Sequence, residues 1–243
     1  MSGDATNFKV AAMMTLPRYE NVYCRNIIDA ALREVGLPLQ TAQGVFYGQC
    51  MQRLFDRAIK HDIDIALTID FDSIFTGKDI MALLQTMANN PQIDACAAMQ
   101  ARRGHHFPLM TIQGETNVDW DGKPIKVSTA HFGLTAIRLK KLESMPKPWF
   151  WSTPGEGGDW EDDTGKIDDD IYFWRNWTSS GNSLYVNPNV CIGHMEEMVA
   201  IHDENMQVVH MYPKAWRQWV DGADREAHEA IAPREEELEQ STP

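Results

Sequence analysis

The chain has 243 residues, 43% of them hydrophobic and 23% charged, and its formal net charge is −13. These values fit one large globular domain, or a domain with a small appendage, that buries a substantial core. The negative charge argues against broad, unspecific binding to nucleic acid, because phosphate groups would repel it. No apolar segment is long enough to span a bilayer, and residues 1–7 contain no basic and apolar signal segment, so we expect a soluble, cytoplasmic protein.

Predicted strands and helices alternate along the chain. In chain order they are a strand at 8–14, a helix at 22–35 ending before Gly36, an extended segment at 39–42, a helix at 48–60, a strand at 63–69, a helix at 77–88, a strand at 94–99 and a strand-like run at 130–137. This alternation predicts an α/β fold with a doubly wound, mostly parallel central sheet, flanking helices and right-handed crossovers.

The four cysteines, Cys24, Cys50, Cys96 and Cys191, are far apart and include no Cys-x-x-Cys pair. Their spacing indicates neither a zinc ribbon nor a disulfide scaffold. We expect all four to be buried free thiols.

The apolar strand at 63–69 runs directly into Asp70-Phe71-Asp72. Residues i and i+2 of a strand point to the same side, so Asp70 and Asp72 can both face a crevice at the carboxyl end of the sheet, where open α/β sheets bind ligands. Two carboxylates at this spacing suit Mg2+ or Mn2+, with positions left for the oxygens of a diphosphate. The same tripeptide also occurs as a solvated turn or a helix cap.

Residues 145–166 are rich in Pro, Gly, Trp and Asp and predict a long, irregular loop. Its aromatic residues could pack against the faces of sugars or bases, or they could anchor the loop on the core. These residues are Trp149, Phe150, Trp151 and Trp160.

Three adjacent acids, Asp168, Asp169 and Asp170, open an apolar helix. The helix dipole explains one or two acids in a first turn and leaves a third unexplained. Later, a strand and a turn lead to Gly193-His194, and imidazole is the commonest nitrogen ligand of divalent metals, although a lone histidine is more often structural.

The order of these elements, with Asp70-Phe71-Asp72, the acidic helix start and the late Gly-His, resembles nucleotide-sugar glycosyltransferases of the GT-A fold, family-2-like, over residues 8–196. The resemblance implies that Asp70 and Asp72 bind Mn2+ or Mg2+ on the donor diphosphate, that Asp70 also borders the donor, and that His194 is a further metal ligand. It also implies that one of the three adjacent acids is the general base of an inverting transfer, without indicating which.

The resemblance places Thr15, Pro17, Arg18 and Gln49 beside the nucleotide of the donor, which it implies to be UDP-linked. It implies a single catalytic domain at 1–215, with a donor half at about 8–100 and an acceptor half at about 101–215, followed by an acidic tail at 216–243. The acceptor hydroxyl could belong to a glycan, a protein or a modified nucleic-acid base. The tail could dock on the core or on a second copy of the chain.

Two basic clusters could meet a phosphorylated or nucleic-acid acceptor, or could be solvated positions that balance an acidic surface. They comprise Arg102, Arg103, His105 and His106 in the first and Arg138, Lys140, Lys141 and Lys147 in the second.

Two other functions remain as alternatives. Asp70-Phe71-Asp72 also resembles the first motif of haloacid-dehalogenase-type phosphatases, with Asp70 as nucleophile, Asp72 as acid/base, Mg2+ as cofactor and residues 158–163 as a late acidic motif. Against it, two strands and two helices precede the motif, and the late motif follows a Pro/Gly-rich loop rather than a strand. The second alternative is a non-catalytic module that binds nucleotide sugars.

Overall fold

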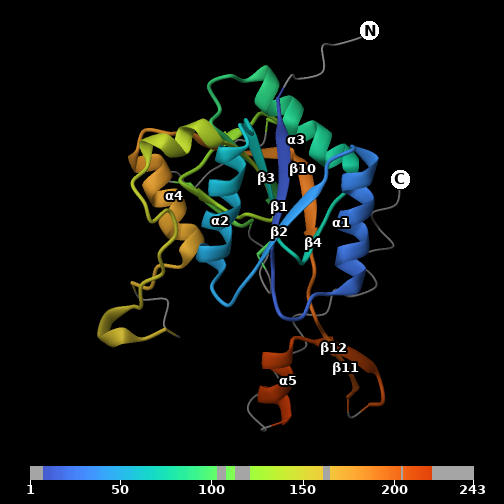
Figure 1. The fold of residues 1–243 in the computed structure, drawn as a ribbon. Coiled ribbons are helices and arrows are strands. Elements are labelled where there is room, and N and C mark those ends of the chain that lie inside the picture. The colour runs from blue at the N-terminus through green and yellow to red at the C-terminus, as the bar shows by residue number, and fades with distance from the viewer. Residues whose placement is uncertain (1–7, 103–107, 113–120, 161–164, 204, 221–243) are drawn as a thin grey trace. The chain divides into compact units, whose positions relative to one another are not determined.

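The computed structural model of the protein describes residues 8–102, 108–112, 121–160, 165–203 and 205–220 (Figure 1). The chain divides into two compact units, residues 1–195 and 196–243. Three segments named above lie outside the described residues: 103–107 of the first basic cluster, 161–163 of the phosphatase-like motif, and the tail from residue 221 onward.

A central sheet of eight strands forms the middle of the first unit, in the order β2-β1-β3-β9-β5-β10-β4, with β7 paired to β10. Its strands are β1 (Val10–Leu16), β2 (Leu39–Gln43), β3 (Ile65–Ile69), β4 (Ser73–Ile74), β5 (Ala95–Gln100), β7 (Ile125–Lys126), β9 (Leu134–Arg138) and β10 (Leu184–His194). β1 pairs in parallel with β2 and β3, and β5 with β10. β9 runs antiparallel between β3 and β5, so β1, β2, β3, β5 and β10 share one direction.

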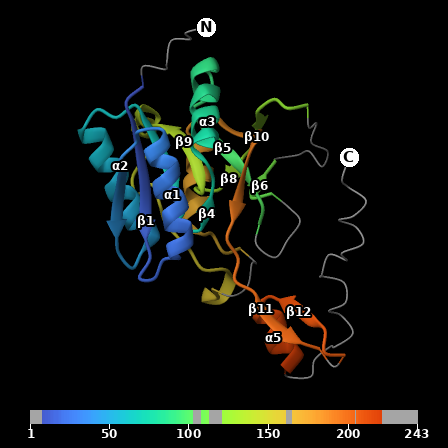
Figure 2. The ribbon, with the colours of Figure 1, turned by 90° about the vertical axis from the view of Figure 1, so that its right-hand side faces the viewer.

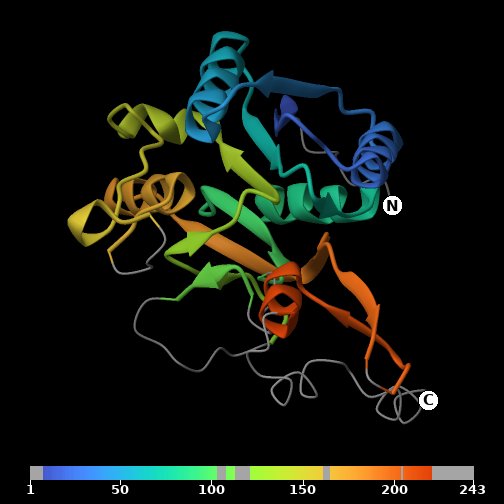
Figure 3. The ribbon, with the colours of Figure 1, turned by 90° about the horizontal axis from the view of Figure 1, so that it is seen from below.

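Helices cover both faces of this sheet (Figures 1 and 3). One core contains the buried faces of α1 (Val22–Glu34) and α3 (Gly77–Asn89), and the other contains those of α2 (Tyr47–Lys60) and α4 (Asp169–Ser179). Successive residues of β1 alternate between the two cores: Ala11 and Met13 join the second, Ala12 and Met14 the first. The predicted fold class, α/β with a doubly wound, mostly parallel sheet and flanking helices, is confirmed.

Local signals explain the helix limits. The Asn21 side chain accepts hydrogen bonds from the backbone N–H groups of Tyr23 and Cys24, which starts α1, and Gly36 follows its end at a φ of +71°. Thr76 and Asp79 form a reciprocal capping box at the start of α3. The predicted helix limits therefore agree with the structure to within about one residue at most ends.

Two predictions from the sequence need correction. The run at 130–137 is two strands, because β8 (Thr129–Ala130) leaves the central sheet to pair with β6 (Met110–Thr111), side by side with it in Figure 2. Cys191 is exposed, not buried, because it lies where the pairing register of β10 shifts and its side chain turns outward; the other three cysteines are buried free thiols as predicted.

Short helices and a second unit complete the description. Of two 3₁₀ turns, η1 (Leu139–Ser144) precedes the loop that leads to α4 and η2 (Glu156–Gly158) lies within it. The second unit contains the antiparallel pair β11 (Val199–His202) and β12 (Val208–Met211), followed by α5 (Pro213–Val220). Within the described ranges, no helix combines the length and the apolar character that crossing a membrane requires.

Candidate active site

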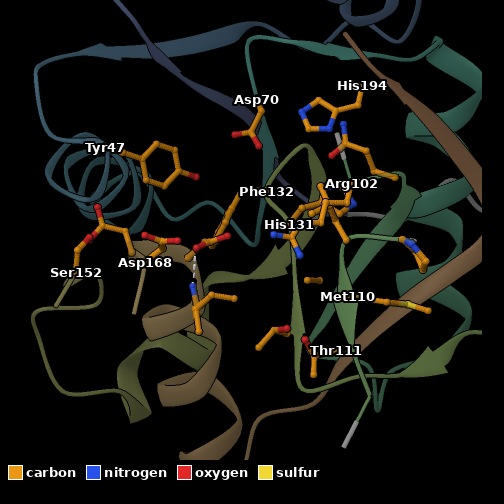
Figure 4. Close-up of a pocket in the computed structure, with 18 residues that line it drawn as sticks. Tyr47, Asp70, Arg102, Met110, Thr111, His131, Phe132, Ser152, Asp168 and His194 are labelled. Atoms are coloured by element: carbon orange, nitrogen blue, oxygen red, sulfur yellow. Dashed lines mark hydrogen bonds between the residues drawn. The ribbon is translucent and has the colours of Figure 1, made fainter. Parts of the chain in front are cut away.

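A pocket of about 670 Å3 opens at the carboxyl ends of the parallel strands (Figure 4). The chain passes from β1 out to β2 and then returns past β1 to β3, so the strand order reverses between β1 and β3. Such a reversal leaves a crevice at the carboxyl edge of the sheet. Predicted site residues line this pocket from two sides: Asp70 and His194 from the sheet, and Asp168, Asp169 and Asp170 from the start of α4.

The first side carries an aspartate–histidine corner made of Asp70, Asp72 and His194, of which Asp70 and His194 line the pocket and Asp72 does not. Asp72 is buried, with 6% of its surface exposed, and its Oδ2 lies 3.4 Å from Nε2 of His194. The other ring nitrogen of His194, Nδ1, lies 3.1 Å from the carbonyl oxygen of Ala101. A carbonyl only accepts hydrogen bonds, so Nδ1 carries a proton, and the other ring nitrogen, Nε2, faces the carboxylate of Asp72.

Backbone hydrogen bonds assemble this corner. His194, the last residue of β10, is paired with Ser73 of the antiparallel β4, which places it directly beside Asp72. The N–H of Met195 donates to the carbonyl oxygen of Asp72 at 2.8 Å, and the N–H of Asp70 donates to that of Gly133 at 3.3 Å. Strand pairing therefore sets the positions of both aspartates and of the histidine.

The residues of this corner fit a divalent cation. Across the described ranges, no group of three His, Cys, Asp or Glu side chains is arranged to hold a metal ion. Mg2+, however, is usually bound by one or two carboxylates together with waters and substrate phosphates, and not by a complete protein cage. Carboxylate oxygens and imidazole nitrogens are both ligands of divalent cations, and metal-binding histidines commonly donate their second N–H to a backbone carbonyl, as His194 does.

The second side of the pocket is formed by the helix-start acids, Asp168, Asp169 and Asp170, which have three different surroundings. Asp168 is 59% exposed and its Oδ1 lies 3.6 Å from Nζ of Lys166. Asp169 accepts a hydrogen bond on Oδ2 from the backbone N–H of Gly48, at 3.1 Å. Asp170 is half-buried and faces the pocket. Burial raises its pKa most, and the charges of Asp168 and Asp169 raise it further. A hydrogen bond from the N–H of Ile171 partly offsets this increase.

Gly48 makes the contact with Asp169 possible. A Cβ at this position would lie 2.5 Å from Cβ of Phe150 and 2.9 Å from Oδ2 of Asp169, closer than side chains can approach. With glycine, the first turn of α2 offers an unpaired backbone N–H to a carboxylate, an arrangement that the helix dipole also favours. Asp169 is thereby engaged in joining α4 to α2.

An aromatic cluster holds α4 in place behind the pocket. Phe173, Trp174 and Trp177 are fully buried. Phe173 stacks on Phe150 with 4.9 Å between ring centroids, and Trp174 stacks on Phe132 at 5.0 Å. Because these rings fix the rotation of α4, they also fix the direction of its acidic first turn.

The aromatic residues of the predicted loop divide into two kinds. Trp149 and Phe150 are buried, and both rings contact that of Phe55, so the anchoring role holds for this pair. Trp151 and Trp160 are more than half exposed, at 56% and 54%. Packing against a sugar or a base stays a prediction for the exposed pair.

Sequence reasoning missed Tyr47, the first residue of α2. Its ring packs edge-on against Phe132 and Phe150, with centroid separations of 6.3 Å and 6.1 Å, and its hydroxyl points into the pocket (Figure 4). Burial, then the charge of Asp70, then those of Asp170 and Asp169, raise the pKa of Tyr47 well above its usual value. The phenol is thus neutral and lies within reach of both sides of the pocket. No local sequence pattern distinguishes this residue from an ordinary helix start.

His131 was also missed, and it forms part of the pocket wall. Its Nε2 lies 2.7 Å from the carbonyl oxygen of Ala98, and its Nδ1 accepts a hydrogen bond from the N–H of Gly133 at 2.9 Å. Burial lowers its pKa to about 4. The hydrogen bond with Ala98 opposes this shift, and the charge of His194 adds to it. Both ring nitrogens are engaged and the ring stays neutral, which suits a structural role.

The predicted basic residues that the structure describes have different surroundings. Arg102 lines the pocket and follows Ala101, the backbone partner of His194. Among the described lining residues it is the only lysine or arginine. In the second cluster, Arg138 donates to backbone carbonyls, whereas Lys141 and Lys147 pair with Asp94 and Asp56.

The four residues predicted to border the nucleotide do not line this pocket. Thr15 lies at the end of β1, paired with Ala42 of β2, and Pro17 and the exposed Arg18 follow it. Gln49 is exposed in the first turn of α2. These residues lie at or follow the carboxyl ends of β1 and β2, outside the 670 Å3 pocket, and their contact with a nucleotide stays a prediction.

Comparison with known proteins adds a fold relationship. No protein-family model and no curated protein matches the sequence. Among solved structures, A197 from STIV is similar with a TM-score of 0.56 and 12% sequence identity, over 84% of this chain and 94% of that chain. At this identity the likeness establishes a shared fold and nothing about activity.

Two further structures are similar at lower scores. GalNAc-T7, solved with UDP, GalNAc and Mn2+, has a TM-score of 0.48 and 10% identity, over 78% of this chain and 44% of that chain. The mannosyltransferase PcManGT from Pyrobaculum calidifontis, solved with GDP-Man and Mn2+, has a TM-score of 0.47 and 12% identity, over 77% of this chain and 56% of that chain. This chain thus matches about half the length of these two proteins, and the scores are too low to support an argument.

Proposed function

We propose that the protein is a metal-dependent glycosyltransferase that moves a sugar from a nucleoside-diphosphate sugar to an acceptor hydroxyl with inversion. The observation that supports this most is the pocket itself, which has an aspartate–histidine corner suited to a divalent cation on one side and a half-buried carboxylate, Asp170, on the other. Direct displacement needs a group that stabilises the leaving diphosphate and a group that accepts the proton of the attacking hydroxyl. The two sides of the pocket offer these two groups.

On the donor side, Asp70, Asp72 and His194 would hold Mn2+ or Mg2+. The cation would neutralise negative charge on the departing nucleoside diphosphate. Arg102 follows the backbone partner of His194 and would bind a diphosphate oxygen directly, since a guanidinium matches phosphate geometry. Thr15, Pro17, Arg18 and Gln49 would border the nucleotide, which the resemblance of the sequence implies to be UDP.

On the acceptor side, Asp170 would be the general base. As the acceptor oxygen bonds to the anomeric carbon, the bond from that carbon to the diphosphate oxygen breaks and Asp170 takes the hydroxyl proton. Asp169 already accepts the N–H of Gly48, and Asp168 is exposed beside Lys166. Asp170 combines burial, a raised pKa and a place in the pocket wall, which are features of a general base.

The test is release of nucleoside diphosphate from a panel of nucleotide sugars without acceptor, with Mn2+ and with EDTA. We expect slow, metal-dependent release from one donor, and its loss in Asp72→Asn. Asp29→Asn is the matched control, because Asp29 lies on α1 and pairs with Arg25, away from the pocket.

Absence of release from every donor, together with phosphate release from a phosphomonoester, would contradict the transferase and favour the phosphatase. That alternative needs Asp72 as an acid/base beside the substrate, whereas Asp72 is buried against His194 and does not line the pocket. Metal-dependent binding of a nucleotide sugar without any turnover, with or without candidate acceptors, would favour the binding module.

A further inference from the structure

The hydroxyl of Tyr47 has no part in the chemistry described so far, although the fold holds it firmly in the pocket. Two edge-on aromatic contacts fix the ring, and Figure 4 shows the hydroxyl pointing into the open space between Asp70 and Asp168. In the described part of the chain, no protein group hydrogen-bonds to this hydroxyl. A polar atom held in place and turned toward the pocket has its hydrogen-bonding capacity available for a ligand.

The position of Tyr47 indicates which part of a ligand it would contact. The negative charges of Asp70 on one side of the pocket and of Asp169 and Asp170 on the other all raise the pKa of its phenol, so the phenol lies near both sides. In an inverting displacement the leaving and attacking oxygens lie on opposite sides of the anomeric carbon. The transferred sugar therefore has to lie between the diphosphate at the aspartate–histidine corner and the acceptor at Asp170, which is the space that Tyr47 faces.

We propose that the Tyr47 hydroxyl binds a ring hydroxyl of the transferred sugar and so determines which donor sugar the protein accepts. This inference rests on the proposed transferase function. The carboxylates around Tyr47 only accept hydrogen bonds, so a sugar hydroxyl that donates to one of them still needs a donor for its own oxygen. The neutral phenol supplies that donor.

Rigidity makes the contact selective. The ring packs against both Phe132 and Phe150, which also contact each other, so the hydroxyl cannot follow a sugar of a different configuration without disturbing the aromatic cluster. A site that is built to hydrogen-bond a substrate hydroxyl discriminates against the analogue that lacks it, because its own polar group is then left unpaired.

Tyr47→Phe tests the inference, since it removes the hydroxyl and keeps the ring contacts. We would measure kcat/KM for metal-dependent release from the preferred donor and from each of its monodeoxy analogues, and the Kd of the nucleoside diphosphate alone. We expect Tyr47→Phe to lower kcat/KM for the full donor about 3- to 10-fold, the loss of one neutral hydrogen bond. For one monodeoxy donor the variant and the wild type should be equal, and nucleoside diphosphate binding and Tm should not change.

Tyr185→Phe is the control, because Tyr185 lies on β10 and packs against the core on the α1–α3 side of the sheet. An equal loss for every donor, weaker binding of the nucleoside diphosphate, or no loss at all would overturn the inference and leave the transferase intact. Wild-type protein that neither binds a nucleoside diphosphate nor releases one from any donor would overturn the proposed function, and this inference with it.

Discussion

The aspartate–histidine corner and the helix-start acids face the same pocket, but they are built differently. Backbone pairing builds the first, where Ser73 of β4 and His194 of β10 are paired and the N–H of Met195 donates to Asp72. Side-chain packing builds the second, where buried rings of α4 fix the direction of its first turn and the N–H of Gly48 donates a hydrogen bond to Asp169. Three adjacent, chemically identical residues thus acquire three different surroundings, whereas the corner depends on residues far apart in sequence that strand pairing brings together.

The largest expected effect comes from Asp170, at the second of these regions. We expect Asp170→Asn to lower kcat between about 100- and 10,000-fold, because the acceptor hydroxyl loses its base. Binding of the nucleoside diphosphate should be unchanged, since that belongs to the opposite side of the pocket. Steady-state kinetics with isothermal titration calorimetry would check both, and a parallel loss of binding would show that the two sides are not independent.

The same variant should be at least as stable as the wild type at pH 7. The folded-state pKa of Asp170 is raised, mainly by burial, so its stabilising contribution is present below the unfolded pKa and is lost as pH rises through the folded pKa. At neutral pH the buried charge therefore costs stability, and asparagine removes it. Tm values of both proteins between pH 4 and 7 would reveal this, with the advantage of the variant shrinking toward low pH.

At the aspartate–histidine corner, a substitution should weaken binding of the nucleoside diphosphate, which Asp170→Asn should leave unchanged. Asp72→Asn should weaken metal-dependent binding of nucleoside diphosphate by about 100-fold or more, because even partners that only orient metal ligands contribute 10- to 100-fold to metal affinity. Titration of Mn2+ at a fixed nucleotide concentration would measure it. If binding is retained and turnover alone is lost, the corner acts in chemistry and not in holding the donor.

His131 belongs to the wall of the pocket that both regions line, and its effect should appear as a pH dependence of stability. Its folded-state pKa is lowered from 6.5 to about 4, so its contribution is complete above the unfolded pKa and is lost as pH falls from 6.5 toward 4. We expect a loss of up to about 3 kcal/mol over this range. Urea unfolding at pH 7.5, 6 and 5 should show a steeper decline for the wild type than for His131→Gln; parallel curves would contradict the assignment.

Asp169 should matter for stability more than for chemistry. Asp169→Ala removes the acceptor of the Gly48 N–H and should cost about 1 kcal/mol, as loss of a helix cap does. Asp169→Asn keeps an acceptor oxygen and should restore most of that loss. Urea unfolding of the pair measures it, and a loss of kcat in Asp169→Asn as large as that in Asp170→Asn would reassign the base.

The smallest effect is expected at Asp168, which is exposed and whose ion pair with Lys166 is solvent-screened. Asp168→Asn should leave kcat within about twofold of the wild type, as substitutions on an exposed surface usually do. The three variants together would rank the helix-start acids. If Asp168→Asn lowered kcat more than the other two variants, the acceptor would bind outside the wall formed by Asp170.

The sequence by itself determined the α/β class, most helix limits and the candidate acids, because these follow from periodicity, capping and short-range spacing. Asp70, Asp72 and the three adjacent acids were visible as local patterns, and so was Gly193-His194. Tyr47 and His131 were not, because what distinguishes them is their surroundings. Tyr47 lies beside the rings of Phe132 and Phe150 and near the carboxylates of Asp70, Asp169 and Asp170, and His131 contacts the backbone of β5.

Only the tertiary structure decided the rest. It moved residues 129–130 out of the central sheet, exposed Cys191 at a register shift, and placed Arg102, but not Arg138, Lys141 or Lys147, in the pocket wall. It also assigned different surroundings to Asp168, Asp169 and Asp170, which no single-sequence argument can rank. The physical reason is that burial, hydrogen-bond partners and pKa are properties of groups brought together across the fold, and adjacent residues on a helix point in different directions.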